Sequence, residues 1–161
     1  CIVNDLDSIK RRLLVIAYED VGLGNPQAVT RVHHAIEAAE FVGFPEAVIP
    51  LGFAIVELAL SPKSRASCDA MHRAMDYASN HPLDIMDYLK YTPVNVQEED
   101  KYPYDRPDLW IKIQYLPELI KDMSFYEPST SMVSSYEKSI NDNYLKFKKI
   151  KRTKDLRNLK K

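Results

Sequence analysis

Apolar residues recur at steps of three and four along the first half of the chain, which is the spacing of one face of an α-helix. The pattern predicts helices over residues 5–20, 25–42, 44–60 and 61–79, and a short one over 83–90. Gly22 and Gly43 follow the first two, because glycine accepts the backbone conformation that ends a helix. Pro50 lies inside the third, so we expect a kink or a late start there. This succession of helices and tight turns predicts an all-α bundle.

The segment DVGLGNP (residues 20–26) contains two glycines, as a phosphate-binding loop would. A dinucleotide loop needs a preceding strand and three spaced glycines, and a P-loop needs Lys and Ser or Thr after its last glycine. Here the preceding segment is helical, and Asn25 and Pro26 follow Gly24. We interpret the segment as a turn in which Asn25 caps the second helix and Pro26 begins it. We expect no catalytic residue, cofactor or metal site in the chain.

The histidines carry only weak support for a metal site. His33 and His34 are adjacent on a predicted helix and point about 100° apart, so they cannot bind one ion together. His72 has Asp69 and Asp76 as helical neighbours, and we favour ordinary hydrogen bonds for it.

Cysteine usage and the apolar runs favour a cytoplasmic protein with no membrane contact. The two cysteines, Cys1 and Cys68, form no disulfide framework, and we expect Cys68 in the core. The start at Cys1 suggests a fragment of a longer protein. The longest apolar run, residues 47–60, is shorter than the ~20 residues that span a bilayer, and we interpret it as a buried helix.

The pattern changes after residue 90. Residues 91–107 are rich in Pro and Tyr and lack a period, and LWIKIQYL (109–116) alternates like a short strand or a packed extended arm. Residues 136–150 look helical again. We therefore expect a helical oligomerisation core over residues 5–90, an extended arm packing on it over 91–128, a C-terminal helix over 129–150 and a basic disordered tail over 151–161.

Positive charge is concentrated at the end of the sequence. Residues 146–161 hold nine of the 22 Lys and Arg residues and one of the 23 acidic residues. Such asymmetry is typical of contact with a polyanion. The candidate contacts are Lys146, Lys148, Lys149, Lys151 and Arg152. The alternatives are a mobile, solubilising end and a basic amphipathic helix at a protein or membrane surface.

The segment SPKSR (61–65) is a second candidate anion site. It places Lys63 and Arg65 at a predicted helix start, where cations are unfavourable by up to about 1 kcal/mol. A phosphate or carboxylate bound by these side chains and Ser64 would relieve that cost. The alternative is a solvated first turn.

Four segments together resemble the C-terminal region of the replication-associated recombination AAA+ ATPases, the MgsA/RarA type, which has a Werner-helicase-interacting counterpart in eukaryotes. They are RRLLVIAYEDVGLGNPQAV (11–29), GFPEAVIPLGFAIVELALSPKSRA (43–66), WIKIQYLP (110–117) and FYEP (125–128). The resemblance covers about residues 5–137. The chain departs from the family pattern at EEDKYPYD (98–105), which lacks the usual glycine, and at Ser135, which replaces the glycine of Gly-Tyr-Glu.

The resemblance implies a helical assembly domain related to clamp-loader collars, within a homotetrameric ATPase that acts at stalled replication forks. ATP, Mg²⁺, the Walker motifs and the arginine finger would then belong to the parent protein upstream of these residues. The implied partners are other copies of the chain, single-stranded or forked DNA, and replication proteins such as single-strand-binding protein. The implied location is cytoplasmic and nucleoid-associated.

We expect oligomerisation to be the main function. Tyr and Trp give large contact area at low entropic cost, so the arm residues Tyr102, Tyr104, Trp110 and Tyr115 are candidate interface residues. The alternative is a DNA-binding module that uses the basic tail and the helix start at residues 61–65.

Overall fold

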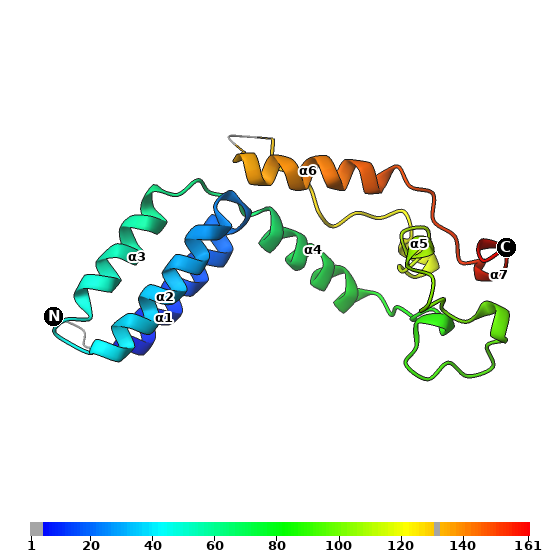
Figure 1. Cartoon of the computed structure of the whole chain (residues 1–161), viewed down its shortest axis with the longest axis horizontal. Helices are drawn as coiled ribbons and strands as arrows, with labels where there is room; N and C mark the ends of the chain where they lie inside the picture. Colours follow the sequence, from blue (N-terminus) through cyan, green and yellow to red (C-terminus); the bar gives the residue numbers. More distant parts are fainter. Residues whose placement is uncertain (1–4, 131–132) are drawn as a thin grey trace. The chain divides into compact units, whose positions relative to one another are not determined.

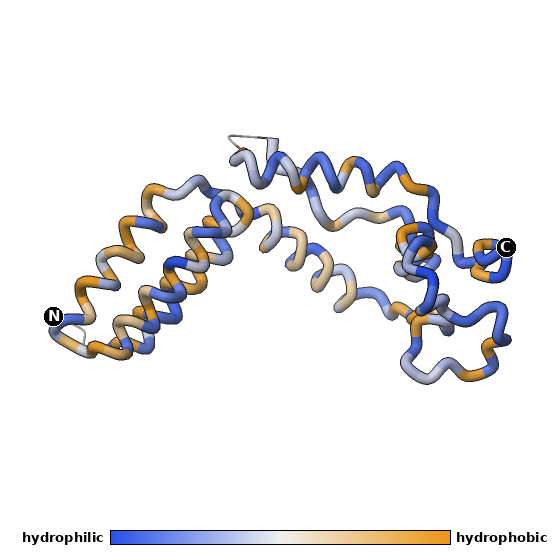
Figure 2. Tube along the Cα trace, viewed as in Figure 1, coloured by the Kyte–Doolittle hydropathy of each residue, from blue (hydrophilic) through white to orange (hydrophobic). Residues whose placement is uncertain are grey.

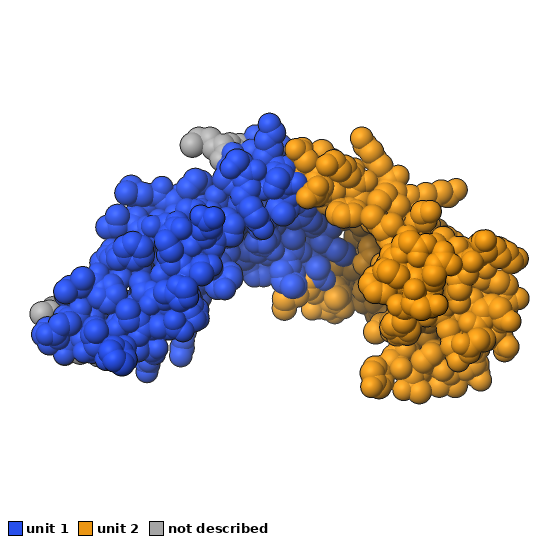
Figure 3. Space-filling view, viewed as in Figure 1, with its two compact units in different colours: residues 1–74, 125–141 blue, residues 75–124, 142–161 orange. Residues whose placement is uncertain are grey.

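The computed structural model describes residues 5–130 and 133–161, and Figure 1 shows the path of the chain. Seven α-helices and no strand are found among these residues, which confirms the predicted all-α class. The chain forms two compact units, coloured separately in Figure 3: residues 1–74 with 125–141, and residues 75–124 with 142–161. The first unit therefore ends earlier than the predicted core and takes in part of the last long helix.

Three helices form the core of the first unit: α1 (Leu6–Ile16), α2 (Pro26–Val42) and α3 (Val48–Leu60). Asp5 caps α1 by accepting a hydrogen bond from the Ser8 amide, and Gly43 follows the last residue of α2 with a φ of 69°. The buried apolar side chains come from all three helices and their connections: Leu13, Ala17, Val21, Ala28, Val29, Val32, Ala35, Ile36, Ala39, Ala47, Leu51, Ala54 and Leu58.

The glycine-containing segment is a turn between α1 and α2, as predicted. A π-helical turn (Ala17–Val21) and a 3-10 turn (Gly22–Gly24) precede Asn25, whose side chain accepts a hydrogen bond from the Ala28 amide at 3.2 Å. A Cβ atom on Gly24 would lie 2.4 Å from the carbonyl oxygen of Pro62. Position 24 requires glycine because the backbone of Pro62 and Lys63 occupies the space that a side chain would need.

Two helix boundaries reflect prolines and tertiary contacts. Helix α3 begins at Val48, which is the late start that Pro50 predicts. Helix α4 (Ala66–Asn80) begins later than the predicted residue 61. Ser61 instead ends α3, and its hydroxyl donates to the Glu57 carbonyl at 2.7 Å. The Ser64 amide donates to the Asp20 carbonyl at 2.8 Å, so the backbone between the helices is bonded to the α1–α2 turn.

The second unit contains short helical turns joined by extended chain. The turns are the 3-10 turns Asp87–Leu89, Glu98–Asp100 and Glu118–Ile120 and the helix α5 (Pro107–Trp110). The predicted helix over 83–90 is thus only the first of these turns. Of the two alternatives for residues 109–116, the strand is wrong, because Leu109 and Trp110 are helical and, within this segment, only Ile113 forms a bridge, parallel to Thr153.

The chain ends in two helices, α6 (Ser135–Lys148) and α7 (Leu156–Leu159). The expectation of a disordered tail is wrong for α7, because Leu156 is 1% exposed and Asp155 caps the helix. Backbone bonds on both sides of Thr153, from the Gln114 amide at 3.0 Å and to the Lys112 carbonyl at 2.9 Å, anchor the segment before it. Among the described helices, none has the length and apolar content needed to cross a bilayer.

Candidate assembly face and basic pocket

The outward face of α3 is apolar. Leu51, Ala54 and Leu58 point into the core. On the other side, Ile49, Phe53, Val56 and Leu60 follow one another at steps of four, three and four, and are 72%, 50%, 57% and 81% exposed. This spacing places them in one row along the helix.

Further apolar side chains widen this row. Val48 and Ile55 on α3 are also exposed, as is Phe41 near the end of α2. Figure 2 shows mainly orange and pale residues along α3. Its one charged side chain, Glu57, accepts a hydrogen bond from Arg31 Nε at 3.0 Å. The interpretation of residues 47–60 as a buried helix is therefore wrong for this chain, because seven of the 13 residues of α3 are exposed. We call Ile49, Phe53, Val56 and Leu60 the α3 row.

The four aromatic residues predicted as interface residues form one cluster in the second unit. The hydroxyls of Tyr102 and Tyr115 are hydrogen-bonded at 2.7 Å, and Trp110 Nε1 donates to the Pro103 carbonyl at 2.8 Å. Burial and the bond to Tyr115 raise the pKa of Tyr102 to about 12. Tyr104 packs on Tyr102 with 4.8 Å between ring centroids and is 75% exposed. Their contact with another chain stays a prediction.

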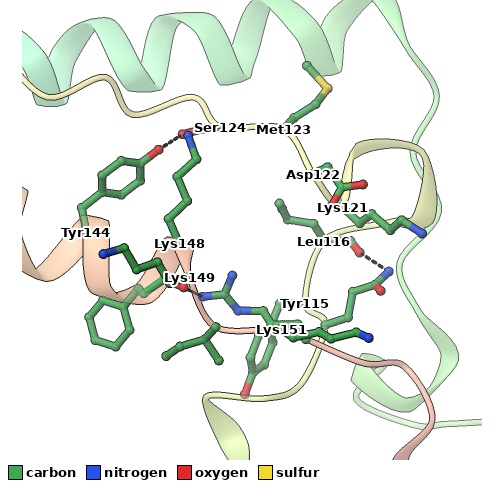
Figure 4. A pocket seen from close by; sticks show the side chains of 14 residues that line it. Tyr115, Leu116, Lys121, Asp122, Met123, Ser124, Tyr144, Lys148, Lys149 and Lys151 are labelled. Carbon is green, nitrogen blue, oxygen red and sulfur yellow. Dashed lines mark hydrogen bonds between the residues drawn. The ribbon is translucent and has the colours of Figure 1, made fainter.

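A cavity of about 770 Å³ in the second unit brings together most of the predicted basic contacts. Figure 4 shows Tyr144, Lys148 and Lys149 on one side of it and Leu116, Lys121 and Asp122 on the other. The lining residues come from three segments: Gln114, Tyr115 and Leu116; Lys121, Asp122, Met123 and Ser124; and Tyr144, Phe147, Lys148, Lys149, Ile150, Lys151 and Arg152. Lys146 is exposed on α6 but does not line it.

The basic residues around this cavity differ in their partners. Lys121, Lys154 and Arg157 pair with Glu118 or Asp100 at 2.6–3.1 Å. Within residues 5–130 and 133–161, no carboxylate lies within ion-pair distance of Lys148, Lys149, Lys151 or Arg152. Lys148 Nζ lies 5.8 Å from the centre of the Tyr144 ring, and Arg152 donates to the Phe147 carbonyl at 3.3 Å. We call these four cations and the cavity they line the basic pocket.

Comparison with known proteins identifies the family. The family model for the MgsA AAA+ ATPase C terminal matches residues 2–148. The chain belongs to this family. It is 43% identical over 153 residues to "Replication-associated recombination protein A" of Bacillus subtilis, over 90% of this chain and 36% of that protein. The Haemophilus influenzae protein of the same name is 32% identical over 129 residues, 75% of this chain and 29% of that one.

A eukaryotic relative also matches. "ATPase WRNIP1" of Dictyostelium discoideum is 31% identical over 131 residues, 74% of this chain and 14% of that protein. The chain thus spans roughly a third of the length of the bacterial relatives named above and less of the eukaryotic one. It corresponds to the C-terminal region of the proteins of a AAA+ ATPase family involved in replication and recombination.

Three of the four segments by which the chain resembles the MgsA family lie in the first unit, and WIKIQYLP (110–117) lies in the second. Asn25 Nδ2 donates to the Ser61 hydroxyl at 3.1 Å, which joins the α1–α2 turn to the SPKSR segment. The Ser64 hydroxyl donates to Glu137 Oε1 at 2.5 Å. Arg73 on α4 donates to the Phe125 carbonyl in FYEP at 2.7 Å. These family motifs therefore hold the fold of this unit.

The cations of SPKSR have partners within the MgsA-family fold itself. Lys63 Nζ donates to the carbonyls of Leu58 and Ser61, both at 2.7 Å, near the end of α3. Arg65 pairs with Glu19 and Asp20 at 2.8 and 3.1 Å. The sequence left an external anion and a solvated first turn as alternatives for these cations; in the fold, carboxylates balance the charge of Arg65, and backbone carbonyls accept the hydrogen bonds of Lys63. An anion or DNA contact here stays a prediction that would require the side chains to leave these partners.

Proposed function

We propose that this chain is the oligomerisation region of a AAA+ ATPase of replication-fork maintenance, and that the α3 row contacts a second copy of the chain. The support is the α3 row itself. Soluble monomers rarely expose a contiguous apolar patch of this kind, and larger patches mark interaction sites. Polar residues would occupy these positions if α3 only covered its own core.

The apolar contribution of the α3 row is similar in size to the free-energy cost of association. Completing the burial of one such side chain contributes about 1–2 kcal/mol. Four from each of two copies would contribute about 8–16 kcal/mol, compared with a cost of association of about 4–15 kcal/mol. A homotetramer also needs a second contact, since a two-fold contact alone closes as a dimer. The exposed parts of Tyr104, Trp110 and Tyr115 are our candidates for it.

Sedimentation velocity on matched variants tests this proposal. Ile49→Glu with Leu60→Lys places one charge of each sign on the α3 row and leaves the net charge unchanged. The control, Ile85→Glu with Leu119→Lys, makes the same changes at 62% and 81% exposed positions of the second unit. We expect the wild type and the control to sediment as oligomers and the α3 variant as a smaller species. Equal sedimentation of all three would remove α3 from the interface.

The basic pocket supports DNA binding as a second function. Lysine and arginine without carboxylate partners attract nucleic-acid phosphates, and Tyr115, Tyr144 and Phe147 supply rings on which unpaired bases stack. This combination favours single-stranded DNA, including the single strands of a fork. The binding would depend steeply on salt and weakly on base sequence.

Two charge-matched variants test this second function. Lys149→Ala with Lys151→Ala removes cations that lack acidic partners, whereas Lys154→Ala with Arg157→Ala removes paired cations of the same terminal segment. We expect the first to flatten the slope of log affinity against log salt by about 0.7 for each phosphate that is no longer neutralised, and the second to change it little. Similar slopes in both would show that net charge alone governs binding.

We also make proposals about the full-length protein to which this chain would belong. Its ATP and Mg²⁺ chemistry would belong to residues outside this chain, and its action at stalled forks, in the cytoplasm and on the nucleoid, would involve proteins such as single-strand-binding protein. We propose these on the basis of the family and its names, "Replication-associated recombination protein A" above all.

A further inference from the structure

One face of α4 carries three potential metal ligands close together. Cys68 and His72 are four positions apart, which places them one above the other on the helix. Cys68 Sγ lies 3.7 Å from His72 Nδ1. Asp69 follows Cys68 and leaves the helix about 100° away from it, as His34 does from His33. Here, however, the Cys68 Sγ, a ring nitrogen of His72 and a carboxylate oxygen of Asp69 still all lie within 4.8 Å of one another.

We propose that Cys68, Asp69 and His72 bind a divalent transition-metal ion of the Zn²⁺ class. Zinc is bound at about 2.3 Å from thiolate sulfur and about 2.0–2.1 Å from imidazole nitrogen, usually in tetrahedral geometry. Two ligands at these distances and the tetrahedral angle are roughly 3.6 Å apart. The observed 3.7 Å between Sγ and Nδ1 matches this separation with α4 as it stands.

The donor set determines the class of ion. Thiolate and imidazole select Zn²⁺ and similar transition metals over Mg²⁺ and Ca²⁺, which prefer oxygen ligands alone. On binding, the Cys68 thiol releases its proton to solvent and its sulfur donates an electron pair to the ion, as do Nδ1 of His72 and a carboxylate oxygen of Asp69. A fourth position remains for water or for a residue of another molecule.

The surroundings leave the three ligands accessible to solvent and leave the Asp69 carboxylate able to bind an ion. Cys68 lies outside the core in which the sequence placed it: Cys68 and Asp69 are half-buried and His72 is exposed, so an ion can reach them from solvent. An ion pair joins Asp69 to Arg65 at 3.6 Å, but Arg65 makes shorter pairs with Glu19 and Asp20. Asp69 can therefore rotate towards a metal while Arg65 keeps two carboxylate partners.

Spectroscopic titration with Co²⁺ tests the site, because Co²⁺ bound to thiolate shows a charge-transfer absorption that a thiol–imidazole hydrogen bond does not. The titration uses the chain with Cys1→Ser, in which Cys68 is the only thiol. We expect one Co²⁺ per chain, the charge-transfer band and displacement by Zn²⁺. Absence of the band would overturn the proposal and leave the hydrogen bond as the function of the pair.

Single variants then assign the ligands. Cys68→Ser should abolish the band, and His72→Gln and Asp69→Asn should each weaken Co²⁺ affinity by at least the roughly 10-fold that even an outer-shell partner contributes. The control is His33→Gln on α2, which removes a histidine that faces Glu37 at 3.6 Å without a thiol nearby and should leave affinity unchanged. Unchanged affinity in His72→Gln or Asp69→Asn would overturn this ligand set, and circular dichroism verifies that each variant is folded.

Discussion

The hydroxyl of Ser64 donates a hydrogen bond to the carboxylate of Glu137 at 2.5 Å, although 73 positions separate the two residues in sequence. Both side chains are buried, at 5% and 1% exposure. The Ser64 hydroxyl also accepts from the Ala66 amide at 3.4 Å, and the Glu137 amide donates to the Ser134 hydroxyl at 3.2 Å. The start of α4 and the start of α6 are therefore joined through one pair of side chains.

Removing the Ser64 hydroxyl should destabilise the first unit. Ser64→Ala leaves a buried Glu137 oxygen without this donor, and an unsatisfied buried polar group costs about 1–3 kcal/mol. We expect a decrease of that size in the free energy of urea unfolding. Ser79→Ala, whose exposed hydroxyl bonds only to its own helix, should change it by less than about 0.5 kcal/mol. Equal effects would mean that the Ser64–Glu137 bond contributes nothing specific.

Substitutions at two glycines should change stability in opposite directions. A Cβ atom on Gly24 would lie 2.4 Å from Pro62 backbone, whereas one on Gly52, inside α3, meets nothing within 4 Å. Gly24→Ala should lower the thermal midpoint, because fixed backbone must move and overpacking costs about 1–3 kcal/mol. Gly52→Ala should raise it, by about 0.5–1 kcal/mol in free energy. Differential scanning calorimetry distinguishes the two signs.

Titration of Tyr102 should show its link to Tyr115. The pKa of Tyr102 is raised from 10.0 to about 12, first by burial and then by the Tyr115 hydroxyl, so folding favours the neutral phenol. The stability from this preference is fully present below pH 10 and is lost as the pH rises towards 12. Absorbance of tyrosinate should show two late-titrating tyrosines, Tyr102 and Tyr88, whose pKa burial also raises, and Tyr115→Phe should shift only the Tyr102 titration to lower pH. The same shift in Tyr91→Phe, at a fully exposed residue, would contradict the assignment.

Truncating Leu156 should release the terminal segment. This side chain is 1% exposed, and removing buried methyl groups from leucine costs about 2–5 kcal/mol. Because Lys and Arg surround it, Leu156→Ala should speed trypsin cleavage after residue 150 while the first unit stays intact. Leu145→Ala, at a 50% exposed position, should leave the cleavage rate unchanged. Cleavage as fast in the wild type as in Leu156→Ala would mean that α7 does not persist.

The helices that were predicted well are those with local end signals. Helix α2 begins at Pro26 and ends at Val42 because the Asn25 side chain caps its start and because Pro26 and Gly43 act through their own backbone. The start of α4 could not be predicted in the same way. Ser61 and Pro62 carry a helix-start signal, yet Ser61 bonds instead to the Glu57 carbonyl at the end of α3 and to Asn25, and only the fold brings Asn25 near.

The candidate sites show the same limit. The α3 row was missed because α3 is apolar on both faces, so its pattern does not show which face a single copy leaves open. The basic residues of the pocket were visible as a run of charge. The opposite wall, residues 121–124, was not, because it comes from a part of the chain without a period.

The bridge between Ile113 and Thr153 anchors the same terminal segment that carries the basic residues, so removing that segment would remove both the anchored backbone and the positive charge. Lys151 and Arg152 lie immediately before that anchor point. A chain that stopped ahead of Thr153 would lose the paired backbone that fixes one wall of the cavity, together with the positive charge that follows it. Shortening the protein and neutralising its lysines are thus different perturbations, and only the second leaves the shape of the cavity in place.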